Sequence, residues 1–155
     1  MSPKADVKRE TSQGEEEVTV DMTTAKTLEP LDPKMPYLMA VSKWKYGKSA
    51  NGNRKVDYAY TVAKPETKGI LGRVVAGSSS LDNEYTLGFV KNLLIGLGFD
   101  KEKIEDKKFK MPHEDDVMGL TSVVFLRTRP AQGIYGERSE ISRVALASAY
   151  PAEED

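Results

Sequence analysis

Residues 55–62 alternate strictly between two kinds of side chain, and this pattern limits the fold more than any other feature of the chain. Large apolar and aromatic side chains stand at every second position: Val56, Tyr58, Tyr60 and Val62. A period of two is that of a β-strand with one buried face. The pattern therefore predicts a half-buried strand over residues 55–63.

A second strand is predicted immediately before it, over residues 37–46. The intervening segment, residues 47–54, contains Asn51-Gly52. This dipeptide supplies the positive φ angles of a tight reversal, so we expect a hairpin with a long basic tip. Pro65 ends the second strand, and residues 70–76 predict a third strand bounded by glycines.

The next segment changes from strand to helical spacing. Apolar residues recur at the period of a helix from residue 89 to residue 97, with Asp82 or Asn83 as the N-cap and Gly98 as the stop. Residues 100–116 are charged and irregular. Two further strands are predicted over residues 120–129 and 134–146, around the turn that begins at Pro130.

The predicted order is three strands, one helix and two strands. This is the order of the OB-fold, a five-stranded, partly open barrel with its helix between strands three and four. A fragment of a β-sandwich or a small α+β sheet would share much of the pattern. The fold class expected is therefore mainly β, with an OB-type barrel preferred.

The 155 residues suffice for one domain with a core. We place a disordered acidic arm at residues 1–34, the OB-like domain at 35–147 and a flexible acidic tail at 148–155. Cysteine is absent, and no segment has the apolar run of a signal peptide or a membrane span. We therefore expect a cytoplasmic protein with no membrane partner and no thiolate chemistry.

The net charge of −1 hides a strong asymmetry. Residues 37–75 carry eight basic and two acidic groups, and residues 120–145 carry four basic and two acidic groups. The other segments are acidic. Such separation is typical of a local electrostatic footprint, although a chance asymmetry on solvated faces gives the same numbers.

Cations and aromatic rings alternate along the first hairpin. Single-stranded nucleic acid is bound by this combination, because cations contact phosphates while rings stack on bases. In an OB barrel the ligand crosses strands two and three, between the one-two and four-five loops. The predicted nucleic-acid-binding residues are Lys43, Trp44, Lys45, Tyr46, Lys48, Arg54, Lys55, Tyr58, Tyr60, Arg73, Arg127, Arg129, Tyr135 and Arg138.

The aromatic residues also have a structural interpretation. Tyr58 and Tyr60 share a face with two valines, so packing in the core explains them as well as stacking does. Trp44 is even-numbered whereas the apolar Met39 and Val41 are odd-numbered, and a β-bulge would bring it inside. The sequence leaves both interpretations open for all three rings.

Catalysis is poorly supported. The single histidine, His113, precedes Glu114, Asp115 and Asp116, and consecutive residues do not converge on one ion without special turn geometry. No phosphate-binding loop or nucleophile with a base is present. We therefore expect no enzyme activity, no metal and no cofactor.

Residues 37 to about 146 resemble small phage-encoded proteins from replication and recombination modules that are thought to be single-stranded-DNA-binding OB-fold proteins. The resemblance lies in four segments: residues 48–53, 93–98, 116–120 and 135–141. It implies the OB topology and a phage origin, and it transfers no individual binding residue.

The function expected is that of a non-catalytic single-stranded-DNA-binding protein of a phage replication or recombination system. The alternative is a protein-binding adaptor or inhibitor. The acidic end, Glu153, Glu154 and Asp155, is the expected contact for replication or recombination proteins. The residues do not distinguish DNA from RNA, and a homo-oligomer is compatible with them.

Overall fold

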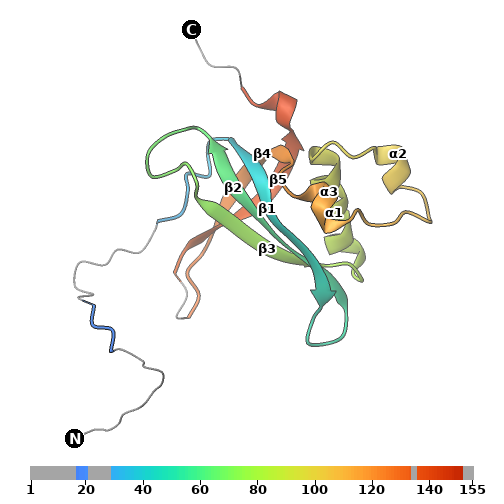
Figure 1. Cartoon of the computed structure of the whole chain (residues 1–155), viewed down its shortest axis with the longest axis horizontal. Coiled ribbons are helices and arrows are strands. Elements are labelled where there is room, and N and C mark those ends of the chain that lie inside the picture. The colour runs from blue at the N-terminus through green and yellow to red at the C-terminus, as the bar shows by residue number, and fades with distance from the viewer. Residues whose placement is uncertain (1–16, 21–28, 134–135, 152–155) are drawn as a thin grey trace, which may run out of the picture.

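The computed structural model describes residues 17–20, 29–133 and 136–151. Its strands and helices follow one another in the order shown in Figure 1. They are β1 (Tyr37–Lys48), β2 (Arg54–Lys64), β3 (Val74–Ser80), α1 (Glu84–Gly96), α2 (Lys101–Ile104), α3 (Glu114–Val117), β4 (Thr121–Arg129), β5 (Arg138–Leu146) and the 3-10 helix η2 (Ala147–Ala149).

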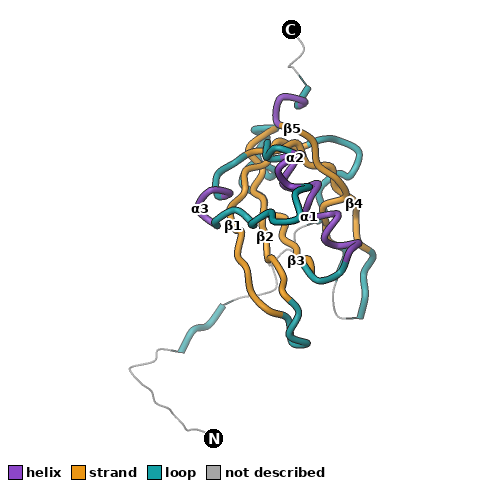
Figure 2. The backbone as a smooth tube through the Cα atoms, turned by 90° about the vertical axis from the view of Figure 1, so that its right-hand side faces the viewer, coloured by secondary structure: helices purple, strands orange, loops and turns teal. Residues whose placement is uncertain are grey.

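All strands join one antiparallel sheet of five strands, in the order β3-β2-β1-β4-β5. Helices α1, α2 and α3 lie together on one side of this sheet, at the right of Figure 1 and toward the viewer in Figure 2. In the described part of the chain, the edge strands β3 and β5 do not pair with each other. The mainly β class with five strands is therefore confirmed, but the closure into a barrel is not.

A bulge in β1 reverses which residues face the core. Val41 pairs with Tyr60 and Lys43 pairs with Ala59, so Ser42 has no position of its own in the register. Before this point the odd-numbered residues of β1 are buried; after it Trp44 is buried, at 2% exposure. The extra residue shifts the alternation by one, which is how a β-bulge redirects side chains.

The alternation of β2 is confirmed. Its inward side chains, Val56, Tyr58, Tyr60 and Val62, are between 0% and 6% exposed. They form the centre of the hydrophobic core together with β1 residues and the buried face of α1. The strand pattern of residues 55–62 thus correctly identifies the side chains of β2 that face the core.

The third strand begins later than the sequence predicts. Residues 70–72 form a turn, in which the amides of Ile70 and Leu71 both donate to the carbonyl oxygen of Thr67. Gly72 has a φ of 85°, a left-handed conformation that favours glycine. The strand therefore starts at Val74 and runs to Ser80. The last strand is also shorter than expected and starts at Arg138.

Helix α1 matches its prediction. The side chain of Asn83 accepts hydrogen bonds from the amides of Tyr85 and Thr86, as an N-cap does. Val90, Leu93 and Leu94 are at most 1% exposed. The segment after this helix, expected to be irregular, contains the short helices α2 and α3.

The helix approaches the sheet closely at Gly96. The hydroxyl of Ser122 in β4 donates to the Gly96 carbonyl oxygen at 3.1 Å. A Cβ added at Gly96 would lie 2.5 Å from Cγ2 of Val144 in β5. Glycine at this position therefore determines how near α1 lies to β4 and β5.

The packed chain extends beyond the sheet at its N-terminal end. Leu31 is 4% exposed and belongs to the core cluster, so packing starts before residue 35, where the sequence places the domain boundary. The arm expected to be disordered falls largely on residues 1–16 and 21–28, which lie outside the described residues. Within the described ranges, every helix is too short or too polar to cross a bilayer.

We expect Gly96→Ala to destabilise the fold by about 1–3 kcal/mol, because the methyl group overpacks the contact between helix and sheet. Urea unfolding followed by far-UV circular dichroism measures this change. Gly88→Ala is the matched control on the same helix, since an added Cβ there meets nothing within 4 Å. The control should gain about 1 kcal/mol from helix propensity. Equal stability of the two variants would contradict the close approach.

Candidate functional site

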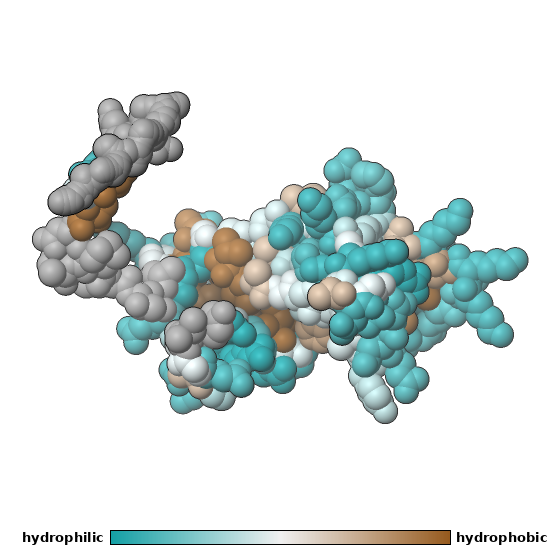
Figure 3. All heavy atoms as spheres, turned by 90° about the horizontal axis from the view of Figure 1, so that it is seen from below, coloured by the Kyte–Doolittle hydropathy of each residue, from teal (hydrophilic) through white to brown (hydrophobic). Residues whose placement is uncertain are grey.

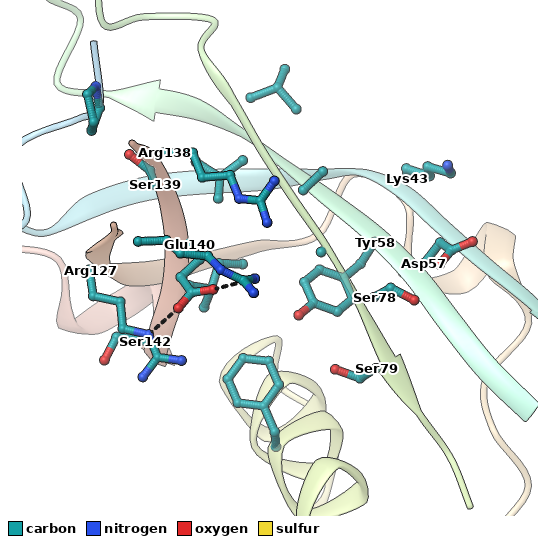
Figure 4. Close-up of a pocket in the computed structure, with 18 of the residues that line it drawn as sticks. Lys43, Asp57, Tyr58, Ser78, Ser79, Arg127, Arg138, Ser139, Glu140 and Ser142 are labelled. Atoms are coloured by element: carbon teal, nitrogen blue, oxygen red, sulfur yellow. Dashed lines mark hydrogen bonds and ion pairs between the residues drawn. The ribbon is translucent and has the colours of Figure 1, made fainter. Parts of the chain in front are cut away.

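A long groove of about 1070 Å³ lies along β3 and reaches β5, and we call it the β3–β5 groove. Figure 4 shows its interior, with side chains from the sheet, the β4–β5 hairpin and α1 around one hollow. It is lined by Glu29, Pro30, Lys43, Asp57, Tyr58, Arg73, Val74, Val75, Ala76, Gly77, Ser78, Ser79, Tyr85, Thr86, Phe89, Arg127, Arg129, Glu137, Arg138, Ser139, Glu140, Ile141 and Ser142.

Five of the predicted cationic residues converge on this groove although they are distant in sequence. They come from β1, from the β2–β3 connection, and from β4 and β5: Lys43, Arg73, Arg127, Arg129 and Arg138. The groove therefore joins the two basic segments of the chain. This convergence depends on the antiparallel order of the sheet, which brings β4 and β5 around to face β3.

Carboxylates line the same groove, and one of them pairs with two of its cations. Glu140 accepts from Nε of Arg127 at 2.6 Å and lies 3.7 Å from Nη1 of Arg129. Figure 4 shows the first of these contacts between labelled residues. Both arginines remain substantially exposed, at 67% and 46% of their side chains. Their guanidinium groups can therefore still reach a ligand.

One end of the groove is hydrogen-bonded to residues 29–31, where the packed chain begins. Nη2 of Arg73 donates to the carbonyl oxygen of Glu29 at 2.7 Å. The amide of Leu31 donates to the hydroxyl of Ser139 in β5 at 2.8 Å. Residues 29–31 thus connect the start of β3 to β5 across one end of the groove.

Asp57 is the acidic group on the β2 side of the groove. A hydrogen bond from the Ser78 hydroxyl, with smaller effects of Lys55 and Lys43, holds the pKa of this carboxyl below its usual value. The carboxylate is therefore ionised at neutral pH. Its charge offsets that of Lys43, which lines the groove beside it (Figure 4).

The remaining predicted cations belong to the β1–β2 hairpin and do not line this groove. Lys45 and Lys48 are exposed on the hairpin, whose tip lies well apart from the strands β4 and β5 in Figure 1. Arg54 is held by Asp82, with Nη2 2.6 Å and Nε 3.0 Å from Oδ1. Lys55 lies 3.2 Å from Asp57. The two basic hairpins therefore do not form one continuous site.

Four of the five aromatic rings named from the sequence belong to the described residues, and these four are in or against the core. Trp44, Tyr58 and Tyr60 are 2%, 6% and 0% exposed. Nε1 of Trp44 donates to the Tyr46 hydroxyl, which donates to the carbonyl oxygen of Pro112 at 2.6 Å. Of the two interpretations left open, packing holds for Trp44 and Tyr60. Tyr58 alone also lines the groove, under Gly77.

Two aromatic residues that the sequence did not identify as candidates line the groove from α1. Tyr85 is 82% exposed, and Phe89 is partly buried beside Tyr58, with ring centroids 6.4 Å apart. They are four positions apart in the sequence, so they share one side of the helix. A pair of aromatic residues four positions apart, directly after the N-cap Asn83, is the sequence pattern from which both could have been predicted.

Other candidates lie outside the groove or outside the described residues. Tyr135, Glu153, Glu154 and Asp155 belong to the second group. Nδ1 of His113 accepts from the amide of Asp115 and so caps α3. Across the described ranges, no three His, Cys, Asp or Glu residues are arranged to hold a metal ion.

The surface around these elements mixes apolar and polar character. Figure 3, seen from below, shows an apolar area in a hollow with hydrophilic side chains projecting around it. Val74, at the start of β3, is 58% exposed and contributes an apolar side chain to the groove.

No protein-family model matches this chain, and no curated protein matches it.

Burial of the only tryptophan gives a direct test of this arrangement. We expect Trp44 emission to be blue-shifted and poorly quenched by acrylamide, because the indole is enclosed by Tyr46, Tyr58 and the core. Addition of oligo(dT) should leave the wavelength of this emission unchanged. Fluorescence spectra of the native and the urea-unfolded chain, each with and without acrylamide, measure the emission wavelength and the quenching. A red-shifted native emission that is freely quenched would contradict the bulge at Ser42.

Proposed function

We propose that this chain is a non-catalytic module that binds single-stranded nucleic acid in the β3–β5 groove. The observation that carries the proposal is the convergence of Lys43, Arg73, Arg127, Arg129 and Arg138 on one hollow. Cations at separate points of an elongated groove suit a ligand with regularly spaced phosphates.

The composition of the groove favours a single strand over a duplex. Five cations and four carboxylates line it, so its net field is weak, and several serine hydroxyls lie between the charges. Hydroxyls and carboxylates suit the hydrogen-bonding edges of bases, which a single strand exposes fully. A duplex would present mainly phosphates to a hollow of this kind.

The sheet order also supports an OB-type domain. Strands in the order β3-β2-β1-β4-β5, with α1 between β3 and β4 in the chain, are what an OB barrel has before its first and last edges pair. Such domains bind oligonucleotides on the face of strands two and three, where Asp57, Ala76 and Ser78 line the groove here. Together with the resemblance to phage proteins, this order supports the proposal of a role in phage DNA replication or recombination in the host cytoplasm.

A second candidate is an adaptor that binds an extended peptide. The observation that favours it is the outer edge of β3, because in the described part of the chain this strand pairs with β2 and with no other strand. Such an edge can accept a further strand through main-chain hydrogen bonds. The two candidates differ in their salt dependence, because release of counterions accompanies phosphate binding.

We expect the affinity for oligo(dT) to fall steeply with salt, and Arg129→Ala to reduce the slope of log K against log salt by about 0.7, the value for one lost phosphate contact with a single strand. Fluorescence anisotropy of a labelled oligonucleotide measures the slope. Lys108→Ala is the control, since it removes the same charge from an exposed position that does not line the groove. Absence of binding at low salt would refute the proposal.

Glu140→Gln should act in the opposite direction. It keeps the shape and an accepting oxygen but removes the charge that holds Arg127 and Arg129. We expect several-fold tighter binding of oligo(dT) at low salt, with the gain shrinking as salt increases. Weaker binding in this variant would mean that Glu140 contacts the ligand or positions the arginines for it.

A further inference from the structure

Tyr85 is an exposed aromatic residue near the start of α1. At 82% exposure on the first turn of α1, it is the most exposed ring among the aromatic residues described in the folded domain. It lines the β3–β5 groove and also a second, shallower hollow of about 810 Å³ along α1. Phe89 lines both hollows as well. These two rings therefore mark the place where the hollows meet.

Gly88 lies between them and has no structural reason to be glycine. Within a helix, glycine costs about 1 kcal/mol relative to alanine. At Gly96 this cost is explained by the sheet, but a Cβ at Gly88 would meet nothing within 4 Å. Its φ is not in the left-handed region either. The open space above Gly88 belongs to the second hollow, which Tyr85 also lines.

A glycine without an internal contact suits close approach of a ligand to the helix backbone. The planar ring beside it suits a flat partner, because aromatic rings stack on any base. Phe89 anchors this surface to the core, because its ring centroid lies 6.4 Å from that of the buried Tyr58.

We propose that Tyr85, Gly88 and Phe89 form a stacking platform for one base of the bound strand, at the point where the strand leaves the β3–β5 groove. This inference rests on the proposed function and adds a site for bases to a groove defined by its cations. The second hollow continues the path past Lys91 and Lys101, which line it. Nζ of Lys91 lies 2.6 Å from Oε2 of Glu105 and is therefore already paired. We accordingly assign the main contact with the strand in this second hollow to the ring of Tyr85.

The experiment compares oligo(dT) with an abasic deoxyribose-phosphate oligomer of the same length. Both carry the same phosphates, and only the first can stack. We expect Tyr85→Ala to weaken binding of oligo(dT) by about fivefold to a hundredfold, the range for one stacked base, and to leave binding of the abasic oligomer unchanged. Tyr85→Phe should retain most of the affinity, because it keeps the ring.

Leu87→Ala is the matched control. Leu87 is 42% exposed on the same helix and lines neither hollow. Its replacement should leave both affinities unchanged. An effect equal to that of Tyr85→Ala would show that loss of any exposed apolar side chain on α1 weakens binding, and would overturn the platform.

Gly88→Ala separates a binding role from a structural one. We expect the melting temperature to rise by about 4 °C from the gain in helix propensity. The same variant should bind oligo(dT) at least about fivefold more weakly, as for loss of one stacked base, because the methyl group occupies the space above the helix. Greater stability together with unchanged affinity would overturn the proposed approach of a base.

The outcomes distinguish this inference from the proposed function. If wild type binds both oligomers equally and Tyr85→Ala changes neither affinity, the platform is wrong while binding in the groove stands. If wild type binds neither oligomer at low salt, the proposed function itself fails. Stronger binding of oligo(dT) than of the abasic oligomer, abolished in Tyr85→Ala, supports the platform.

Discussion

The bulge at Ser42 is the constraint on which the arrangement of the site depends. It lets one short basic and aromatic stretch serve two purposes, since Trp44 enters the core while Lys43 faces the groove. Without the extra residue, the alternation of β1 would place Trp44 outside and the lysines inside, where an unpaired charge is costly. The register of the whole sheet follows, because β1 is its central strand and pairs with both β2 and β4.

The groove lies where the sheet curves and where, among the described residues, its edge strands β3 and β5 do not pair. Helix α1 lies close against β4 and β5 at Gly96, whereas β3 reaches the same region from the other edge. Between these edges the side chains of Phe89 and Tyr58 fill the inner part, and the arginines of the β4–β5 hairpin occupy the outer part. A fully paired barrel would bury much of this space. The candidate site therefore depends on the edge strands β3 and β5 remaining unpaired with each other.

Local patterns in the sequence predicted the elements better than their assembly. The period of two in β2 and the cap and spacing of α1 are properties of neighbouring residues, and both were correct. The start of β3 was wrong because a turn around Gly72 uses β-branched and apolar residues that resemble a strand. Tyr85 was missed because its significance comes from β3 and β5, which lie far away in the sequence.

Charge alone is a poor guide to what this groove would select. Its carboxylates nearly balance its cations, so long-range attraction is weak and each contact acts only at short range. Phosphate contacts position a strand but do not distinguish one base from another. Any preference for particular bases must therefore come from side chains that contact the bases. Three aromatic residues line the groove: Tyr58, Tyr85 and Phe89. Tyr58 is only 6% exposed, which leaves the rings of α1 as the lining groups available for stacking. The proposed division between cations that contact phosphates and rings on α1 that stack on bases therefore depends on the bulge that buries Trp44.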